Sequence, residues 1–168
     1  DHIGSTLLPM TAAGINPQDD WDALGMRGSG SQSIVFDNVQ VPQAAVRRMG
    51  PWGKWSIPVL LNRTMANLPL VGAFLGMAEA ANEFAIASVN DQQKLGQPVN
   101  TKPGVQHVVG EMTMELAKCQ SIMRQAGDGM DDFLERHRSQ PATLEAAHAI
   151  MQDYQSAKWT VNRGAISI

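Results

Sequence analysis

Glycines, serines and an arginine gather in the segment LGMRGSGSQS, which runs from residue 24 to residue 33. Bare backbone N–H groups beside a cation can bind phosphate, so this segment could in principle cradle a nucleotide. Its spacing, however, is G-x-x-G-x-G, and the run IVF that follows is typical of a strand. A dinucleotide-binding loop needs a helix N-terminus behind the anion. We therefore interpret the segment as a connection between two strands.

The other reactive residue types form no catalytic or metal-ligating pattern. The histidines are His2, His107, His137 and His148. None of them makes a helical i, i+4 pair, and there is no Cys/His cluster, so we expect no metal site. The carboxylates of DDW (19–21) and DGMDD (128–132) are interpreted as solvated turns. Cys119 lies on a helical apolar stripe and is expected to be a buried, inert thiol.

Composition narrows the class of protein. The chain has 168 residues, of which 43% are hydrophobic, enough for one domain or two small ones. A net charge of -3 argues against a nucleic-acid binder. The single cysteine excludes an internal disulfide and fits a cytoplasmic location. We find no apolar run near the roughly 20 residues of a membrane span and expect no membrane partner. The chain does not begin with Met, and its start DHIGSTLLPM resembles mid-strand sequence, so we expect a fragment or a processed product.

Residues 1–50 have the pattern of short strands. The runs STLLPM (5–10), SIVFD (33–37) and VQVP (39–42) are separated by Gly, Asn, Asp and Pro. Ile34 and Phe36 share one face, and Asp37–Asn38 is predicted to turn the chain. So few strands cannot close a barrel or sandwich, and we expect that a sheet partner is missing or comes from another chain.

From about residue 56 onward the pattern is helical. One apolar stripe comprises Val105, Val108, Met112, Leu116, Cys119, Met123, Ala126, Met130 and Phe133. A second comprises Leu144, Ala147, Met151, Tyr154, Val161, Ala165 and Ile168, with Lys158 on the same stripe. Both have spacings of three and four residues, typical of amphipathic helices. The second helix is expected to start at Thr143.

The segment 70–89 predicts a further helix, whose start depends on whether Pro58 and Pro69 begin it or kink it. The polar segment 90–104 must connect it to the next helix. Three long antiparallel helices with apolar stripes need a fourth to close a bundle. We therefore expect an exposed apolar stripe that promotes self-association.

These residues resemble the acyl-CoA dehydrogenase family. WDALGMRGSGSQSIVFDNVQVP is similar to the end of that family's middle β-domain, where L-G-M-R-x-(S/T)-x-S precedes a stretch ending V-x-V-P. The matching residues are Trp21, Leu24, Gly25, Met26, Arg27, Ser29, Ser31, Phe36, Asp37, Val39, Val41 and Pro42. LGMAEAANEFA, LGQPV and QHVVGEM resemble, in the right order, a helix, a loop and the next helix start of the family's C-terminal domain.

The resemblance implies a mixed, mainly α fold: the end of a middle β-domain followed by an incomplete antiparallel four-helix bundle of acyl-CoA dehydrogenase type. Residues 1–50 would be the last strands of the β-domain, and residues 51–168 about three helices of the bundle. The family holds FAD between the subunits of a homotetramer. Its usual catalytic glutamate would lie beyond Ile168, so we expect no catalytic residue in this chain and no dehydrogenase turnover from it alone.

The flavin-facing connection of the family maps onto residues 92–106. Lys94, Gly96, Lys102 and Gln106 are the candidate cofactor-binding residues that this resemblance implies. This chain departs from the family pattern at three positions: Gln92, Leu95 and Pro103 stand where the family has arginine, phenylalanine and glutamine. The family's arginine reaches the FAD pyrophosphate, so its loss removes a charged hydrogen bond worth roughly 1.5–3 kcal/mol and weakens FAD binding.

Three functions are compatible with these observations. The first is α,β-dehydrogenation of an acyl-CoA thioester with FAD. The second is a flavin-dependent monooxygenase of the same fold, which uses reduced flavin, FAD or FMN, and O₂ on an aromatic substrate. The altered FAD motif fits it better, as does Ala66, where some family members place the catalytic glutamate. The third is a non-enzymatic helical assembly module. In either enzyme, Arg27 and its neighbouring serines are expected near the polar end of the substrate.

Overall fold

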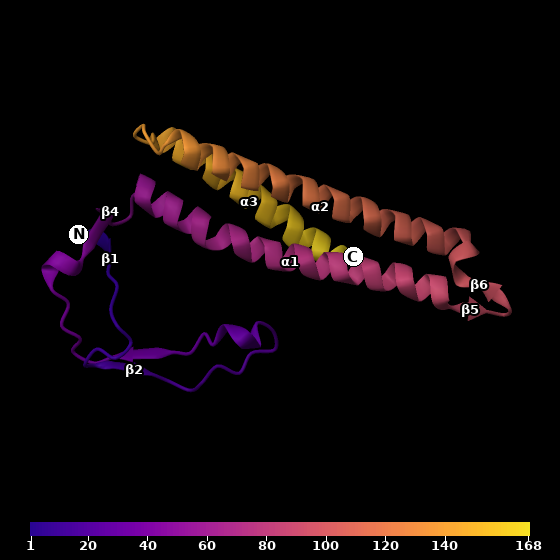
Figure 1. Cartoon of the computed structure of the whole chain (residues 1–168), viewed down its shortest axis with the longest axis horizontal. Helices are drawn as coiled ribbons and strands as arrows, with labels where there is room; N and C mark the ends of the chain where they lie inside the picture. The colour runs from indigo at the N-terminus through magenta and orange to yellow at the C-terminus, as the bar shows by residue number, and fades with distance from the viewer. The chain divides into compact units, whose positions relative to one another are not determined.

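The computed structural model describes residues 1–168, which divide into two compact units, Asp1–Lys54 and Trp55–Ile168 (Figure 1). The first unit contains short strands and single-turn helices, and the second contains three long helices. Each unit has its own internal contacts and is described by itself below.

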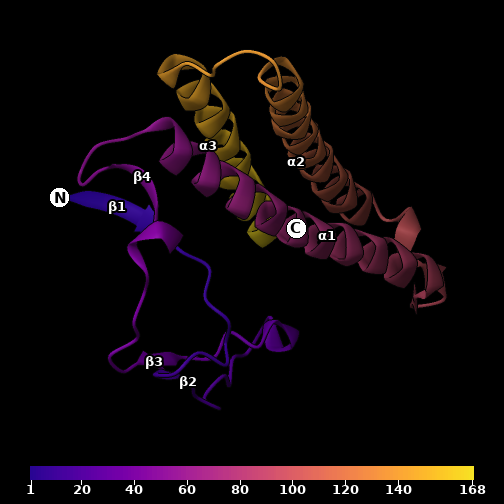
Figure 2. The same ribbon diagram turned by 60° about the vertical axis from the view of Figure 1, so that its left-hand side comes forward.

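The first unit consists of two small antiparallel ladders. Strand β1 (His2–Ser5) pairs with β4 (Arg47–Pro51), and β2 (Ile15–Pro17) pairs with β3 (Ile34–Phe36) (Figure 2). The 3₁₀ turns η1 (Arg27–Ser29) and η2 (Gln43–Ala45) interrupt the connections. Since each ladder has only two strands, it has too little apolar surface to form a core, and side-chain hydrogen bonds carry much of the local order.

The strand predictions are partly correct. The run IVF forms β3, and the chain bends at Asp37–Asn38, where Asn38 has φ +48°. VQVP is not a strand, and of STLLPM only Ser5 belongs to one. Strands β2 and β4 were not predicted, because INP and RRMGP lack the apolar alternation by which strands are identified. Pairing with β3 and β1 makes them strands despite their sequence.

The second unit is built from helices α1 (Ile57–Asp91), α2 (Pro103–Arg136) and α3 (Leu144–Ser167). Helix α3 packs against both α1 and α2 (Figures 1 and 2). Pro58 lies in the first turn of α1, where its missing N–H costs nothing, and the helix continues through Pro69. Thr143 caps α3 as predicted, since its hydroxyl accepts a hydrogen bond from the backbone N–H of Ala146 at 3.1 Å.

A short hairpin connects α1 to α2. It comprises β5 (Gln93–Lys94) and β6 (Gln97–Pro98), followed by the 3₁₀ turn η3 (Val99–Thr101). The polar segment 90–104 is thus a connection, as predicted, and it brings the end of α1 close to the start of α2.

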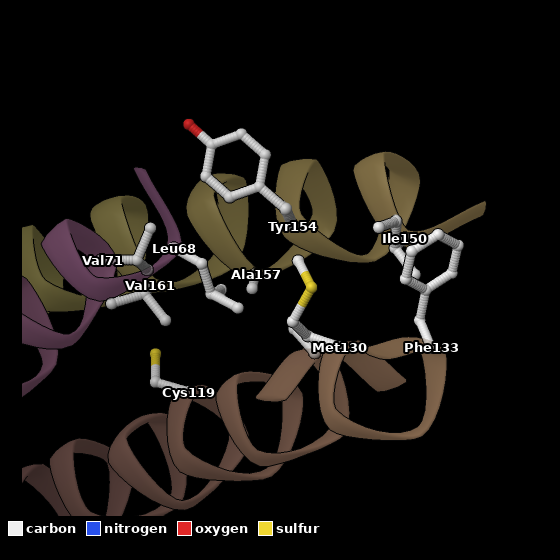
Figure 3. Packing of buried hydrophobic residues seen from close by; sticks show 10 residues of the cluster. Leu68, Val71, Cys119, Met130, Phe133, Ile150, Tyr154, Ala157 and Val161 are labelled. Carbon is white, nitrogen blue, oxygen red and sulfur yellow. The ribbon is translucent and has the colours of Figure 1, made fainter. Parts of the chain in front are cut away.

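The core of the second unit lies between the three helices. Figure 3 shows its members from α1 (Leu68, Val71), α2 (Cys119, Met130, Phe133) and α3 (Ile150, Tyr154, Ala157, Val161). Gly164 allows α2 and α3 to approach closely, because a Cβ atom there would collide with the Sγ of Cys119. Six members of this core lie on the apolar stripes predicted from helical periodicity: Cys119, Ala126, Met130, Phe133, Tyr154 and Val161.

Three positions of the predicted stripes are wrong, and one of them is Leu144 at the start of α3, which is 44% exposed. Val108, near the start of α2, is 53% exposed. Lys158 is also exposed, since it follows the buried Ala157 by 100° around the helix and points away from the core. Ala157, three residues after Tyr154, continues the apolar stripe instead.

Helix α1 has apolar residues on its exposed side as well as on its buried side. Leu70, Phe74, Met77 and Phe84 are all exposed large hydrophobic residues. By length and composition α1 is apolar enough to cross a membrane, so the expectation that no such run exists is wrong. A single helix of this kind is weak evidence for a membrane span, because core helices of bundles pass the same test.

Candidate functional site

The hairpin between α1 and α2 carries the residues predicted to bind a cofactor. Lys94 lies in β5, and Gly96 forms the turn together with Leu95. Lys102 precedes α2, and Gln106 lies in its first turn. Leu95 and Gly96 have φ +56° and φ +73°, values that a two-residue hairpin turn of type I′ requires. Leu95 is 94% exposed at this turn.

Three hydrogen bonds fix the connection between the helices. The N–H of Val99 donates to the carbonyl oxygen of Gln92 at 3.0 Å. The Nδ2 of Asn100 donates to Oδ1 of Asn90 at 3.0 Å, and the Nε2 of Gln106 donates to the carbonyl oxygen of Asn100 at 3.0 Å. These bonds tie the end of α1 to the start of α2, so the hairpin has a defined position within its unit.

An open groove of about 480 Å³ lies beside this connection. Its lining residues are Ile86, Val89, Asn90, Asn100, Val105, Gln106, Val109, Gly110, Thr113 and Met114. The structure places Gln106 in this lining but not Lys94, Gly96 or Lys102. Apolar walls with a few amide groups can bind a planar heteroaromatic ring.

The two lysines of the connection are not neutralised by acidic neighbours. Lys94 is exposed and Lys102 is half-buried, and neither belongs to an ion pair. Gln92, which ends α1, is exposed and uncharged. The positive charge available to an anion at this connection therefore comes from the two lysine side chains.

Arg27 lies in the other unit, in a long loop between β2 and β3 that Asp20 and Gln32 close. The Oε1 atom of Gln32 accepts hydrogen bonds from the backbone N–H groups of Asp20 at 2.7 Å and Trp21 at 2.6 Å. Oδ1 of Asp20 accepts from the N–H of Ser33 at 2.8 Å. Hydrogen bonds from Ser33 lower the pKa of the Asp20 carboxyl. The glycine-rich segment is a strand-to-strand connection, as predicted.

Asp20 and Gln32 were not identified from the sequence. DDW lies in an exposed loop, as expected, with Asp20 hydrogen-bonded across it. The interpretation of DGMDD (128–132) as a turn is wrong, because this segment lies inside α2. Asp20 lies just before the glycine-rich segment and Gln32 lies near its end, and this closeness to the segment is the one signal in the sequence that could have drawn attention to them. Short polar side chains often bond to backbone groups in loops, but such a partner cannot be assigned from spacing alone.

The remaining candidates show no assembled reactive centre. Cys119 is buried as predicted, and burial raises the pKa of its thiol. His107 pairs with Glu111 at 3.4 Å on an exposed face of α2. No three His, Cys, Asp or Glu side chains come together to form a metal site.

A second groove, of about 700 Å³, lies between α2 and α3. Its wall includes Lys118, Trp159 and Arg163, with the Arg163 guanidinium 4.8 Å from the centre of the Trp159 ring. None of the residues predicted to bind cofactor or substrate lies in this groove.

Comparison with known proteins identifies relatives along the whole chain. The amino sugar nitrososynthase DnmZ of Streptomyces peucetius is 28% identical over 99% of this chain and 39% of its own length. The probable acyl-CoA dehydrogenase YngJ of Bacillus subtilis is 25% identical over 88% of this chain and 37% of its own length. The crystal structure of KijD3 with FMN and dTDP-3-amino-2,3,6-trideoxy-4-keto-3-methyl-D-glucose matches with a TM-score of 0.81 and 27% identity, over 98% of this chain and 39% of that one.

The chain spans about two fifths of the length of the curated relatives it matches. The predicted fold class is confirmed, with small antiparallel sheets followed by three long packed helices. The sequence profile described as "Acyl-CoA dehydrogenase, C-terminal domain" matches residues 62–162, more than half of the chain. The chain therefore belongs to the acyl-CoA dehydrogenase family and carries its C-terminal domain.

Proposed function

We propose that this chain is the C-terminal part of a flavin-dependent monooxygenase with the acyl-CoA dehydrogenase fold. The observation that carries the proposal is the uncharged Gln92 at the end of α1, where the family's FAD-binding motif has arginine. An arginine at this position would bind the pyrophosphate of FAD and act as a clamp on that cofactor. A monooxygenase supplied with reduced flavin from another enzyme has no need of that clamp.

The residues of the connection fit a flavin with one phosphate better than one with two. Lys94 and Lys102 are unpaired cations, and a single phosphate group can be neutralised by two such side chains. We therefore favour FMN over FAD, with Lys94, Gly96, Lys102 and Gln106 as the residues that would hold it. The FMN in the KijD3 structure supports this choice.

The reaction we propose is the insertion of oxygen into a small-molecule substrate. When bound, the reduced flavin supplies two electrons, so that one atom of O₂ enters the substrate and the other leaves as water. The role of this chain is to bind the small molecules of the reaction and to exclude water from them. The apolar side chains Ile86, Val89 and Val105 of the groove provide a surface from which water is displaced, and the side-chain amide of Gln106 provides an orienting polar group.

Similarity to known enzymes also favours oxygenation, since the two nitrososynthases DnmZ and L-evernosamine nitrososynthase are each 28% identical over almost all of this chain. The dehydrogenation of an acyl-CoA thioester is the second candidate, favoured by the likeness to YngJ. Against it, Ala66 occupies the position in α1 at which some family members carry the catalytic glutamate. The expected homotetramer and the cytoplasmic location remain part of the proposal, and so does a small-molecule substrate.

The test uses the longest polypeptide that the gene encodes, together with NADH and a flavin reductase. We expect oxygen uptake that depends on FMN and rises when indole or a dTDP-amino sugar is added, with ¹⁸O from ¹⁸O₂ in the product. Turnover of an acyl-CoA with an artificial electron acceptor, without oxygen incorporation, would establish the dehydrogenase instead. Failure to bind either FMN or FAD would leave the assembly module.

A further inference from the structure

We propose that Asp20 and Gln32 act as a clasp that presets the loop of Arg27 to receive the anionic end of the substrate. The two side chains are positioning residues, because they act through Arg27 and not on the substrate itself. The inference rests on the proposed function and on the expectation, stated above, that Arg27 lies near the polar end of the substrate.

The clasp joins the two ends of the loop by reciprocal hydrogen bonds. Oε1 of Gln32 accepts hydrogen bonds from the backbone N–H groups of Asp20 and Trp21. Oδ1 of Asp20 accepts one from the backbone N–H of Ser33. The backbone adds a further bond between the same ends, from the N–H of Gln18 to the carbonyl oxygen of Ser33 at 2.8 Å. The residues between these ends, 22–31, are thus closed into a ring whose base cannot open without breaking several bonds.

The interior of the ring fixes the residue next to Arg27. The carbonyl oxygen of Met26 accepts hydrogen bonds from the indole Nε1 of Trp21 at 3.2 Å and from the N–H of Ser29 at 3.0 Å. Met26 is held at φ +52°, a left-handed conformation that an unbranched side chain rarely adopts without support. Gln32 bonds to the backbone N–H of Trp21, and the indole of Trp21 bonds to the carbonyl oxygen of Met26. The backbone direction at Arg27, which follows Met26, therefore depends on Gln32.

The charge of Arg27 is available to a ligand. Arg27 is exposed and belongs to no ion pair, although three aspartates lie within eight residues before it. The carboxylate of Asp20 accepts a hydrogen bond from the N–H of Ser33. Oδ1 of Asp19 lies 3.4 Å from Nε2 of Gln32. The hydroxyl groups of Ser29 and Ser31 lie beside Arg27 in the sequence and hydrogen-bond to each other at 2.8 Å. A guanidinium with neighbouring hydroxyl groups suits an anionic oxygen group such as phosphate.

Trypsin, which cleaves after Arg27, measures how well this loop is held in the 168-residue chain. We expect Gln32→Ala and Asp20→Ala to speed cleavage after Arg27 by about tenfold relative to cleavage after Arg48 and Lys54 in the same unit, as local opening becomes easier. Asp20→Asn keeps an oxygen for the N–H of Ser33 and should cleave as slowly as the wild type. Gln40→Ala, which removes only an exposed bond to Asn38, is the matched control.

The second measurement is the affinity of the longest encoded polypeptide for dTDP, for coenzyme A and for thymidine. Gln32→Ala and Arg27→Ala should both weaken binding of whichever anionic probe is recognised by about tenfold, while thymidine, which has no phosphate, distinguishes contacts to the base. Equal cleavage in the wild type and Gln32→Ala, or equal acceleration at all sites, would overturn the clasp. Unchanged affinity for both anionic probes in both variants would overturn its link to the substrate. Absence of flavin-dependent oxygen uptake with these contrasts intact would contradict the proposed function alone.

Discussion

The two units of this chain are stabilised by different means. In Trp55–Ile168, three helices enclose a continuous apolar core in which Phe133 is 5% exposed. In Asp1–Lys54, Ile15 is the one buried hydrophobic residue, and Phe36 is 63% exposed. Non-directional burial holds the helical unit together, whereas individual hydrogen bonds, such as those of Gln32, hold the strand unit. The same kind of substitution should therefore have very different effects in the two units.

The pair Phe133→Ala and Phe36→Ala tests this contrast most strongly. Truncating Phe133 should lower the free energy of unfolding of the helical unit by about 3–5 kcal/mol, because a buried ring leaves a cavity. Truncating the exposed Phe36 should change the free energy of unfolding of its own unit, Asp1–Lys54, by less than about 0.5 kcal/mol. Urea unfolding followed by circular dichroism and tryptophan fluorescence measures both. A loss at Phe36 as large as that at Phe133 would show that residues 1–54 possess a core of their own.

Gly164→Ala tests how closely the helical core is packed. The added methyl group would meet Sγ of Cys119 and come within 2.9 Å of Oε1 of Glu115, so we expect a loss of about 2–3 kcal/mol in stability. Gly127→Ala is the matched control, since its methyl group would meet no atom within 4 Å and should stabilise α2 by up to about 1 kcal/mol. Adding Cys119→Ala to Gly164→Ala should recover part of the loss. Equal effects at the two glycines would mean that α2 and α3 are not in close contact.

Gln92→Arg tests the connection between α1 and α2, the part of the helical unit that carries the candidate cofactor-binding residues. Restoring the arginine of the family motif should tighten FAD binding about tenfold while leaving FMN almost unchanged, in line with roughly 1.5 kcal/mol for a charged hydrogen bond. Flavin fluorescence titration of the longest encoded polypeptide measures both affinities. Gln93→Arg places the same charge one residue away and should have no such effect. Equal gains for FAD and FMN would indicate general attraction between charges.

Leu95→Asn should have the smallest effect. Asn tolerates the left-handed conformation that Leu95 adopts at φ +56°, and Asn-Gly is the preferred pair in a type I′ turn. We expect a gain of about 0.5 kcal/mol, seen as a higher midpoint of thermal unfolding. Leu24→Asn removes an equally exposed leucine in the strand unit and should leave the midpoint unchanged. A lower midpoint in Leu95→Asn would show that the exposed leucine packs against another chain.

Sequence reasoning succeeded where one physical effect repeats along the chain. Leu116, Cys119, Ala126, Met130 and Phe133 were all predicted from spacing and are all buried in α2. Helical periodicity reports burial because each turn places the same face against the same neighbours. It failed at Val108 and Leu144, which are both exposed, because periodicity marks one face of a helix but not which positions on that face a neighbour covers.

The strand unit was harder to predict for a different reason. Strand β4 contains two arginines and a glycine, and it is a strand because β1 supplies hydrogen-bond partners more than 40 residues away in sequence. The bonds from Asp20 and Gln32 across the loop also join residues far apart in sequence. In the connection, the candidate residues Lys94, Gly96, Lys102 and Gln106 came from a family resemblance, and the structure adds that the groove beside them is lined by Gln106 but not by the lysines.

The single thiol of the chain has a practical consequence. Cys119 has no exposed surface and lies where α2 and α3 cross. A maleimide reagent can therefore modify it only during transient separation of the two helices, and burial also disfavours the reactive thiolate. The rate of modification in native buffer gives the frequency of that separation, with no dye or engineered cysteine. Because the strand unit contains no thiol, the signal comes from the helical unit alone.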